Sequence, residues 1–269
     1  MSKGKGYEIS KYPASRKIVI DLMEQGSKKH HVKGLITLDI TEPRKIFRNY
    51  KEKTGNSLSF TGWIIACVGK AVTMHKELNA YKKRNKIYTF DDFDVGIVIE
   101  RELGGIKVPT KYIIKRVNEK SFKEIHEEIR SVQAQESDSP FLGSKKDKTT
   151  KIVSFFASLP KFLRKIVWWY INNHPPLRKK FIGNATITSV GMFAKIGGWA
   201  IVISSETLHV MIGGMSKKPL VIDDKIEIRE CVDLTVMVDH VVVDGGPFTR
   251  FTQSLAELVE GGYGLEEFE

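Results

Sequence analysis

The sequence predicts an α/β protein with a sheet at its centre. Helix-type and strand-type patterns alternate along most of the chain, and residues 184–244 are mostly strand-like. The length of 269 residues is enough for a core that buries most of the apolar surface. No internal repeat is visible, so the chain fits one large domain or two small ones.

The elements follow from the spacing of apolar residues. Residues 15–30 place them at helical intervals ahead of Gly26, which is typical of a helix that ends at a glycine. Residues 31–41 alternate as a strand does, and residues 91–100 read as an interior strand. Residues 59–78 predict a largely buried helix. Two further helices are expected, a surface helix over residues 118–136 and a closing helix over residues 247–262.

The two cysteines and the N-terminus indicate the compartment. Cys67 and Cys231 lie far apart in apolar surroundings, which predicts two buried thiols in a reducing compartment. The N-terminal "MSKGKGYEIS" has no apolar core, and no stretch approaches about 18 uninterrupted apolar residues. We therefore expect a cytoplasmic protein without a signal peptide or a membrane anchor.

The net charge of +11 is concentrated in one stretch. From Lys145 to Lys180 there are ten Lys or Arg residues and one acid, Asp147, whereas the rest of the chain is close to balanced. No zinc-knuckle, RNP-type or basic-zipper pattern occurs. The sequence therefore argues against a nucleic-acid partner.

The same stretch combines aromatic and basic residues and allows two interpretations. The aromatic residues are Phe155, Phe156, Phe162, Trp168, Trp169 and Tyr170, and the basic residues are Lys161, Arg164, Lys165, Arg178, Lys179 and Lys180. One interpretation is a helical hairpin packed on the body, with Pro160 opening its second helix and a solvated basic face. The other is an interfacial helix on anionic lipid, or a lid over an apolar substrate channel.

The stretch "VMVDHVVVDGG" places a histidine in an apolar run. Its plain interpretation is a strand entering an Asp-Gly turn, with His240 held by a hydrogen bond. Strand alternation would place His240, Val242 and Asp244 on one face and Asp239 on the other. Burying these groups costs several kcal/mol unless they are paired or used, which favours a functional role for His240.

Residues 239–245 resemble a known signature. They are similar to the Asp-His-Arg-x-x-Asp-Gly motif of the coenzyme A-dependent acyltransferases that form the catalytic cores of 2-oxo-acid dehydrogenase complexes, the dihydrolipoyl acyltransferases. They resemble chloramphenicol acetyltransferase more distantly. Val241 stands where the arginine is usual, and chloramphenicol acetyltransferases carry a small residue there.

The resemblance extends along nearly the whole chain in sequence order. "SRKIVIDLM" resembles the first helix of the family, and "KHHVKGLITLDIT" resembles the next strand, with His31 on a common histidine. "VGIVIERELGGIKVPTKY" matches a strand and turn at Gly105 and Pro109, and "GNATITSVGMFAKIGGWAIVISSETLHVMIGGM" resembles a later segment. The resemblance implies one catalytic domain over residues 1–269 with a chloramphenicol acetyltransferase-like fold, a mixed central sheet flanked by helices. Residues 141–182 form an aromatic-basic helical insertion.

The resemblance also implies roles for single residues. His240 takes the proton of an acceptor thiol, whose pKa near 8.5 leaves it mostly protonated at neutral pH, and returns a proton to the leaving thiol. A hydroxyl donates to the oxyanion, and Thr188, with Ser189 beside it, stands where the family has serine. Asp244 pairs with Arg16 of the first helix to support the histidine loop, and Gly245 permits the following turn.

Partners and cofactors follow from the same resemblance. Coenzyme A is the expected co-substrate, with no metal and no bound lipoyl group, and a separate lipoyl-type carrier is a possible acceptor. A trimer or a multiple of trimers is implied, with the active-site channel between subunits. The intact His240, Asp244 and Gly245 favour an active acyltransferase. Val241, Thr188 in place of serine and the lack of carrier domains favour a silent scaffold, which residues 141–182 could attach to an anionic membrane surface.

Overall fold

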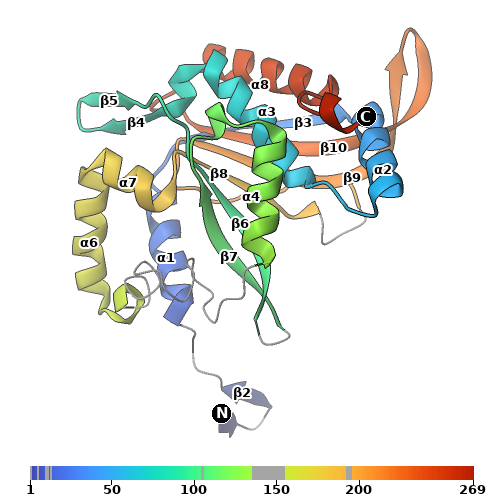
Figure 1. The fold of residues 1–269 in the computed structure, drawn as a ribbon. Coiled ribbons are helices and arrows are strands. Elements are labelled where there is room, and N and C mark those ends of the chain that lie inside the picture. Colours follow the sequence, from blue (N-terminus) through green and yellow to red (C-terminus); the bar gives the residue numbers. More distant parts are fainter. Residues whose placement is uncertain are drawn as a thin grey trace.

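A six-stranded mixed sheet forms the centre of the computed structural model, which describes residues 2–4, 6–9, 12, 14–103, 106–134, 155–191 and 196–269 (Figure 1). In spatial order its strands are β3 (His31–Asp39), β10 (Lys225–Asp239), β9 (Leu208–Ile222), β8 (Ala185–Ser189), β6 (Val95–Leu103) and β7 (Ile106–Ile114). β8 runs parallel to both of its neighbours, and the remaining pairs are antiparallel. The predicted α/β fold with a mixed central sheet is therefore confirmed.

Four helices pack against the sheet and against one another to enclose the core (Figure 1). They are α2 (Thr41–Thr54), α3 (Phe60–Met74), α4 (Phe122–Ala134) and α8 (Gly245–Glu260). The helix predicted as largely buried is α3, in which ten residues from Gly62 to Val72 are buried. Aliphatic strand residues such as Val95, Ile187 and Val236 meet these helices with almost no exposed surface. Burial of this apolar surface is the main stabilising contribution to the fold.

A second group of helices, α1 (Ala14–Gly26), α6 (Lys161–Asn173) and α7 (Pro175–Ile182), gathers at one side of the molecule, at the left of Figure 1. As predicted, α1 ends at Gly26 and α6 begins directly after Pro160. Gly105 and residues 141–154 of the predicted insertion lie outside the described residues.

The smaller elements complete the chain. They are the hairpins β1 (Ser2–Gly4) with β2 (Tyr7–Ile9) and β4 (Ala80–Lys83) with β5 (Lys86–Thr89), and the short 3-10 helices η1 (Lys76–Asn79), η2 (Val117–Glu119) and η4 (Glu266–Phe268). None of the helices in the described ranges is long and apolar enough to cross a membrane.

One strand prediction is wrong, at the end of β10. The strand stops at Asp239, and residues 240–243 form a turn that leads into α8. The amide of Val242 donates to the carbonyl of Asp239 at 2.8 Å, which closes the turn. Strand alternation therefore does not apply beyond Asp239, and the predicted shared face of His240, Val242 and Asp244 does not exist.

Candidate active site

The turn after β10 presents the imidazole of His240 to solvent. The side chain is 49% exposed, and its Nδ1 lies 3.2 Å from the carbonyl oxygen of Val243. A carbonyl only accepts, so this contact requires the proton on Nδ1. In the neutral ring, Nε2, which has no partner among the described residues, then carries a free lone pair. The ring is held in the tautomer that a general base needs.

The two aspartates of this motif occupy different environments. The side chain of Asp244 is 90% exposed at the N-cap of α8, and its Oδ1 lies 3.7 Å from Nδ1 of His240. Asp239 is buried, and its Oδ2 accepts a hydrogen bond from Nζ of Lys29 at 2.7 Å. Burial alone would raise the pKa of Asp239, but the bond and charge of Lys29, together with the amide of Val241 and the charge of His31, outweigh it, and the pKa lies below its ordinary value. Lys29, which sequence reasoning missed, anchors the strand end that carries His240.

Within one chain, Asp244 does not pair with Arg16, its predicted partner. Arg16 is exposed on α1, and it forms no ion pair with Asp244 among the described residues. The pairing of Arg16 with Asp244 therefore stays a prediction. Gly245 is the first residue of α8, and an added Cβ there would meet no atom within 4 Å, so its role in permitting the turn also stays a prediction.

Thr188 and Ser189 are neighbours on β8. The Oγ1 of Thr188 lies 3.1 Å from Nε2 of His209 on β9. Adjacent strand residues point to opposite faces of a sheet, so Ser189 faces away from His209. Only one of the two hydroxyls therefore faces the polar cluster around His209.

A chain of hydrogen bonds extends inward from Thr188. Nδ1 of His209 lies 3.0 Å from Oγ of Ser204, and that hydroxyl lies 2.6 Å from Oε2 of Glu206. Burial would raise the pKa of Glu206, but the nearby Lys111, with Arg178 and His209, lowers it to about 2. An ionised Glu206 only accepts, so Ser204 donates to it and in turn accepts from Nδ1 of His209.

The same reasoning decides which way the hydroxyl of Thr188 donates its proton. Burial lowers the pKa of His209 to about 4, so the ring is neutral near pH 7. With its proton on Nδ1, His209 accepts at Nε2, and Thr188 donates to it. Sequence reasoning missed His209, Ser204 and Glu206. The available signal was "SSETLHV", where polar residues and a histidine interrupt an apolar strand.

Strand register separates Thr188 from His240 in one chain. Thr188 pairs with Met211 on β9, and Met211 pairs with Thr235 on β10. His240 follows Thr235 by five residues, a distance of roughly 17 Å along the strand at ~3.3 Å per residue, and β8 lies two strands away at ~4.8 Å per strand. The two side chains are therefore about 20 Å apart, too far to act on one carbonyl group within one subunit.

A cleft of about 260 Å³ adjoins the backbone of His240. Its lining residues are Gly26, Ser27, Lys29, His30, His31, Lys33, Val202, Ile203 and Met237. The amide of His240 donates to the carbonyl of His30 at 2.9 Å, which places the cleft beside the turn. The lining contains lysine and histidine side chains and no acidic residue, so the cleft favours an anionic ligand.

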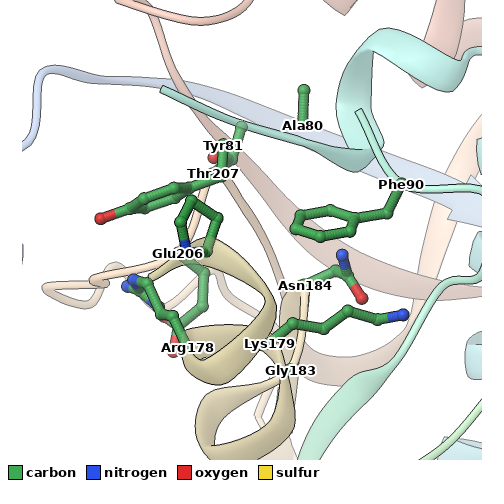
Figure 2. Close-up of a pocket in the computed structure, with 10 residues that line it drawn as sticks. Ala80, Tyr81, Phe90, Arg178, Lys179, Gly183, Asn184, Glu206 and Thr207 are labelled. Carbon is green, nitrogen blue, oxygen red and sulfur yellow. The ribbon is translucent and has the colours of Figure 1, made fainter. Parts of the chain in front are cut away.

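A second cavity, of about 20 Å³, lies where α7 meets the β4–β5 hairpin (Figure 2). Figure 2 shows Arg178 and Glu206 on one side of it, near the ring of Tyr81. The guanidinium of Arg178 lies 4.9 Å from the centroid of that ring, and its Nη2 donates to the carbonyl of Ser205. The cavity lies at the contact between α7 and the body of the protein. It has room only for a water-sized molecule, so it is no substrate site.

The two cysteines and the possible metal ligands also bear on the chemistry of the site. Cys67 and Cys231 are buried and unpaired, as predicted. In the part of the chain that the structure describes, no group of three His, Cys, Asp or Glu residues could hold a metal ion.

Known proteins share this sequence pattern and this fold. The profile of the 2-oxoacid dehydrogenases acyltransferase (catalytic domain) family matches residues 5–142 and 182–265. The acetyltransferase component of the pyruvate dehydrogenase complex of Rickettsia prowazekii is 24% identical over 223 residues, which are 83% of this chain and 45% of that protein. The chain therefore spans about half the length of the curated relatives it matches.

Two solved structures show the same fold. A probable dihydrolipoamide acetyltransferase from Listeria monocytogenes superposes with a TM-score of 0.69 at 21% identity and covers 96% of each chain. The dihydrolipoamide acetyltransferase of Azotobacter vinelandii superposes with a TM-score of 0.66 at 17% identity, covering 97% of this chain and 95% of that one. The family profile matches most of the residues on both sides of the aromatic-basic segment, and the chain belongs to the 2-oxoacid dehydrogenase acyltransferase (catalytic domain) family.

Proposed function

We propose that the protein transfers an acyl group between coenzyme A and a thiol, of a lipoyl type or another small acceptor. The observation that carries this proposal is the free Nε2 of His240, held by the bond from Nδ1 to Val243 in a solvent-exposed turn beside a cationic cleft. Family membership supports the same chemistry. We further propose that residues 1–269 act as one catalytic domain with an insertion at about 141–182.

The proposed reaction uses His240 twice. Nε2 accepts the proton of the acceptor thiol, and the resulting thiolate attacks the carbonyl carbon of the acyl-coenzyme A thioester. The tetrahedral intermediate then loses the sulfur of coenzyme A, which takes the proton back from His240. One residue therefore serves both directions of the transfer.

We propose Thr188 as the hydroxyl that stabilises the oxyanion. The catalytic mechanism of the Azotobacter vinelandii enzyme has been studied through one serine, one histidine and one asparagine, with the serine 52 residues before the histidine and the asparagine four after it. Thr188 and Asp244 stand at the same spacings from His240. Ser189 is a weaker candidate because it faces away from His209.

The separation of about 20 Å within one chain, from the register argument, supports an active site shared between subunits. We propose a trimer, or a multiple of trimers, in which His240 of one subunit meets Thr188 of the next. A ring of three identical head-to-tail interfaces contains three such sites. In this assembly we expect Asp244 to pair with Arg16.

Coenzyme A fits the cleft beside His240. The molecule carries several phosphate groups, and Lys33 supplies a cation at the cleft, whereas the charge of Lys29 is already paired with Asp239. Lys33 forms no ion pair with any described residue, so its charge is available. A separate lipoyl-type carrier remains the proposed acceptor, and the cytoplasm remains the predicted location.

The first test of the proposal measures thiol release from acetyl-coenzyme A with dihydrolipoamide and other acceptors. The wild type is expected to release coenzyme A, and His240→Ala, compared as the same oligomer, is expected to lose at least a hundredfold in kcat. Equal silence of both proteins, together with no binding of coenzyme A, would leave a non-catalytic binding protein instead.

Mixed trimers test the shared site. Equal amounts of His240→Ala and Thr188→Ala chains are co-expressed and purified as one oligomer. In a head-to-tail ring, each mixed trimer contains one interface with both wild-type residues, so random assembly restores about a quarter of the wild-type activity. No gain over the two separate variants would contradict a site shared in this way.

A further inference from the structure

Three side chains of α6 donate hydrogen bonds to α1. The guanidinium of Arg164 donates from Nε and Nη2 to the carboxylate of Asp21 on α1, at 2.7 and 3.0 Å, and both side chains are only 5% exposed. One turn later, Nε1 of Trp168 donates to the same carboxylate at 3.2 Å. Asn172 donates to the side chain of Gln25 at 2.8 Å. The contact between α1 and α6 therefore includes these hydrogen bonds and two ion pairs, Arg164 with Asp21 and Lys161 with Glu24.

The opposite face of α6 is apolar and exposed. Its residues are Phe162, Ile166, Trp169 and Tyr170, which are between 51% and 65% exposed. The i, i+4 and i+7 spacing places them in one stripe, and Figure 1 shows α6 at the outer edge of the molecule. This arrangement is the reverse of an ordinary surface helix, which buries its apolar stripe. α6 packs on α1 and contacts α7, in agreement with the hairpin interpretation of the sequence, but its exposed face carries these apolar residues beside the basic ones.

The chain segment that carries this stripe has charges of one sign. Residues 155–191 contain six Lys or Arg residues and no Asp or Glu. Lys161 pairs with Glu24 of α1, and Lys179 pairs with Asp92. Lys165 and Lys180 are exposed and form no ion pair with any described residue. The apolar stripe is therefore flanked by cations that remain available to a partner.

The exposed stripe of α6 lies outside the segments that the family profile matches. The family profile matches residues 5–142 and 182–265, and α6 lies in the part between. Surfaces that family members have in common, including those by which subunits associate, therefore do not require α6. A second copy of this chain is for that reason a less suitable occupant than a partner specific to this protein.

We propose that the exposed stripe of α6 binds the surface of an anionic lipid membrane. Trp and Tyr are the side chains that favour the boundary between lipid headgroups and acyl chains, because one end of each is apolar and the other is polar. The unpaired Lys165 attracts anionic headgroups, and each lysine near the surface strengthens binding by about fivefold. The helix lies in the plane of the surface, and the inward bonds to Asp21 hold it in that orientation.

The test uses the purified oligomer and vesicles of defined composition. Sedimentation with phosphatidylcholine vesicles and with vesicles containing 30% phosphatidylserine measures binding, and the total tryptophan emission is followed for a blue shift that Trp169→Ser should reduce. The wild type is expected to bind the anionic vesicles and not the neutral ones. Lys165→Gln is expected to weaken this binding by about fivefold.

Two further variants separate the stripe from general hydrophobicity. Trp169→Ser is expected to weaken binding by at least about tenfold. Val221→Ser, at a residue 71% exposed on the distant β9–β10 hairpin, removes an exposed apolar side chain as well and is expected to bind like the wild type. Equal binding by all three proteins, or no binding by the wild type, overturns the proposal. An oligomer that dissociates only in Trp169→Ser, without any lipid binding, would instead assign the stripe to a second copy. None of these readouts depends on acyl transfer.

Discussion

Replacing Arg164 by methionine tests how α6 is held. The substitution keeps much of the side-chain volume but leaves the carboxylate of Asp21 buried with Trp168 as its remaining donor. Removing one partner of a buried ion pair costs about 3 to 5 kcal/mol. The lower end applies here, because the indole N–H of Trp168 still donates to Asp21. We therefore expect a loss of about 3 kcal/mol, or roughly two powers of ten in the equilibrium between docked and detached α6.

The assay uses the position of the tryptophans. Trp168 and Trp169 lie on α6, so in a background with Trp63→Phe and Trp199→Phe their fluorescence during urea unfolding reports this helix, and circular dichroism reports the whole fold. In Arg164→Met the fluorescence transition is expected at lower urea than the circular dichroism transition, which would show that α6 detaches before the sheet unfolds.

Lys165→Met is the matched control. It removes the same charge from the next residue, which is exposed and has no ion pair among the described residues, and we expect a change within about 0.5 kcal/mol. Asp21→Asn combined with Arg164→Met removes the unpaired charge and is expected to recover part of the loss. If Arg164→Met and Lys165→Met unfold alike, the buried pair does not hold α6 and the reasoning is refuted.

Three further predictions concern the hydrogen-bond chain behind Thr188. Thr188→Ala is expected to lower kcat by 10²- to 10³-fold, whereas Thr188→Ser keeps the hydroxyl and stays within about tenfold of the wild type; a smaller loss in Thr188→Ala would argue against the proposed oxyanion donor. Nitrogen-15 NMR of labelled histidine is expected to find His209 neutral at pH 7 with its proton on Nδ1, and a proton on Nε2 would contradict the assigned directions. Because the folded pKa of His209 is about 4 and a free histidine titrates near 6.5, the unfolded chain binds more protons between these values. The free energy of unfolding is therefore expected to fall by about 2 kcal/mol from pH 7.5 to pH 5, measured by urea titration, and His209→Gln is expected to lose this part of the pH dependence.

The direction of the Thr188 proton has a mechanistic cost. In the resting chain this proton points to His209, so the hydroxyl has to turn away from Nε2 before it can donate to an oxyanion. Giving up one neutral hydrogen bond costs about 1 kcal/mol. Thr188 is therefore a weaker donor than a hydroxyl without such a partner.

The sequence predicted the elements that depend on local pattern. The apolar spacing in residues 59–78 and the glycine at 26 are properties of neighbouring residues, and α3 and the end of α1 agree with them. α2 was not predicted. Its sequence is mostly polar, and only Pro43 and Phe47 are buried on it.

The features that the sequence did not predict depend on strand register and on residues far apart in the chain. Apolar spacing shows that α6 has two faces, but which face is buried is decided by Asp21 and Gln25, about 140 residues earlier in the chain. Likewise Lys29 reaches Asp239 because His31 and Asp239 are paired in the sheet, a register that neither segment reveals alone. The strand argument for His240 fails because the residue lies in a turn and not in a strand, and its role as the base stays a prediction.

The burial of both cysteines matters for a protein proposed to handle thioesters. Cys67 and Cys231 are at most 1% exposed, and burial raises the pKa of both thiols, so neither forms a reactive thiolate at neutral pH. An acyl group held near His240 therefore meets no sulfur nucleophile of the protein itself. Neither cysteine therefore competes for the acyl group or forms mixed disulfides with the thiol products, and both still serve as core residues.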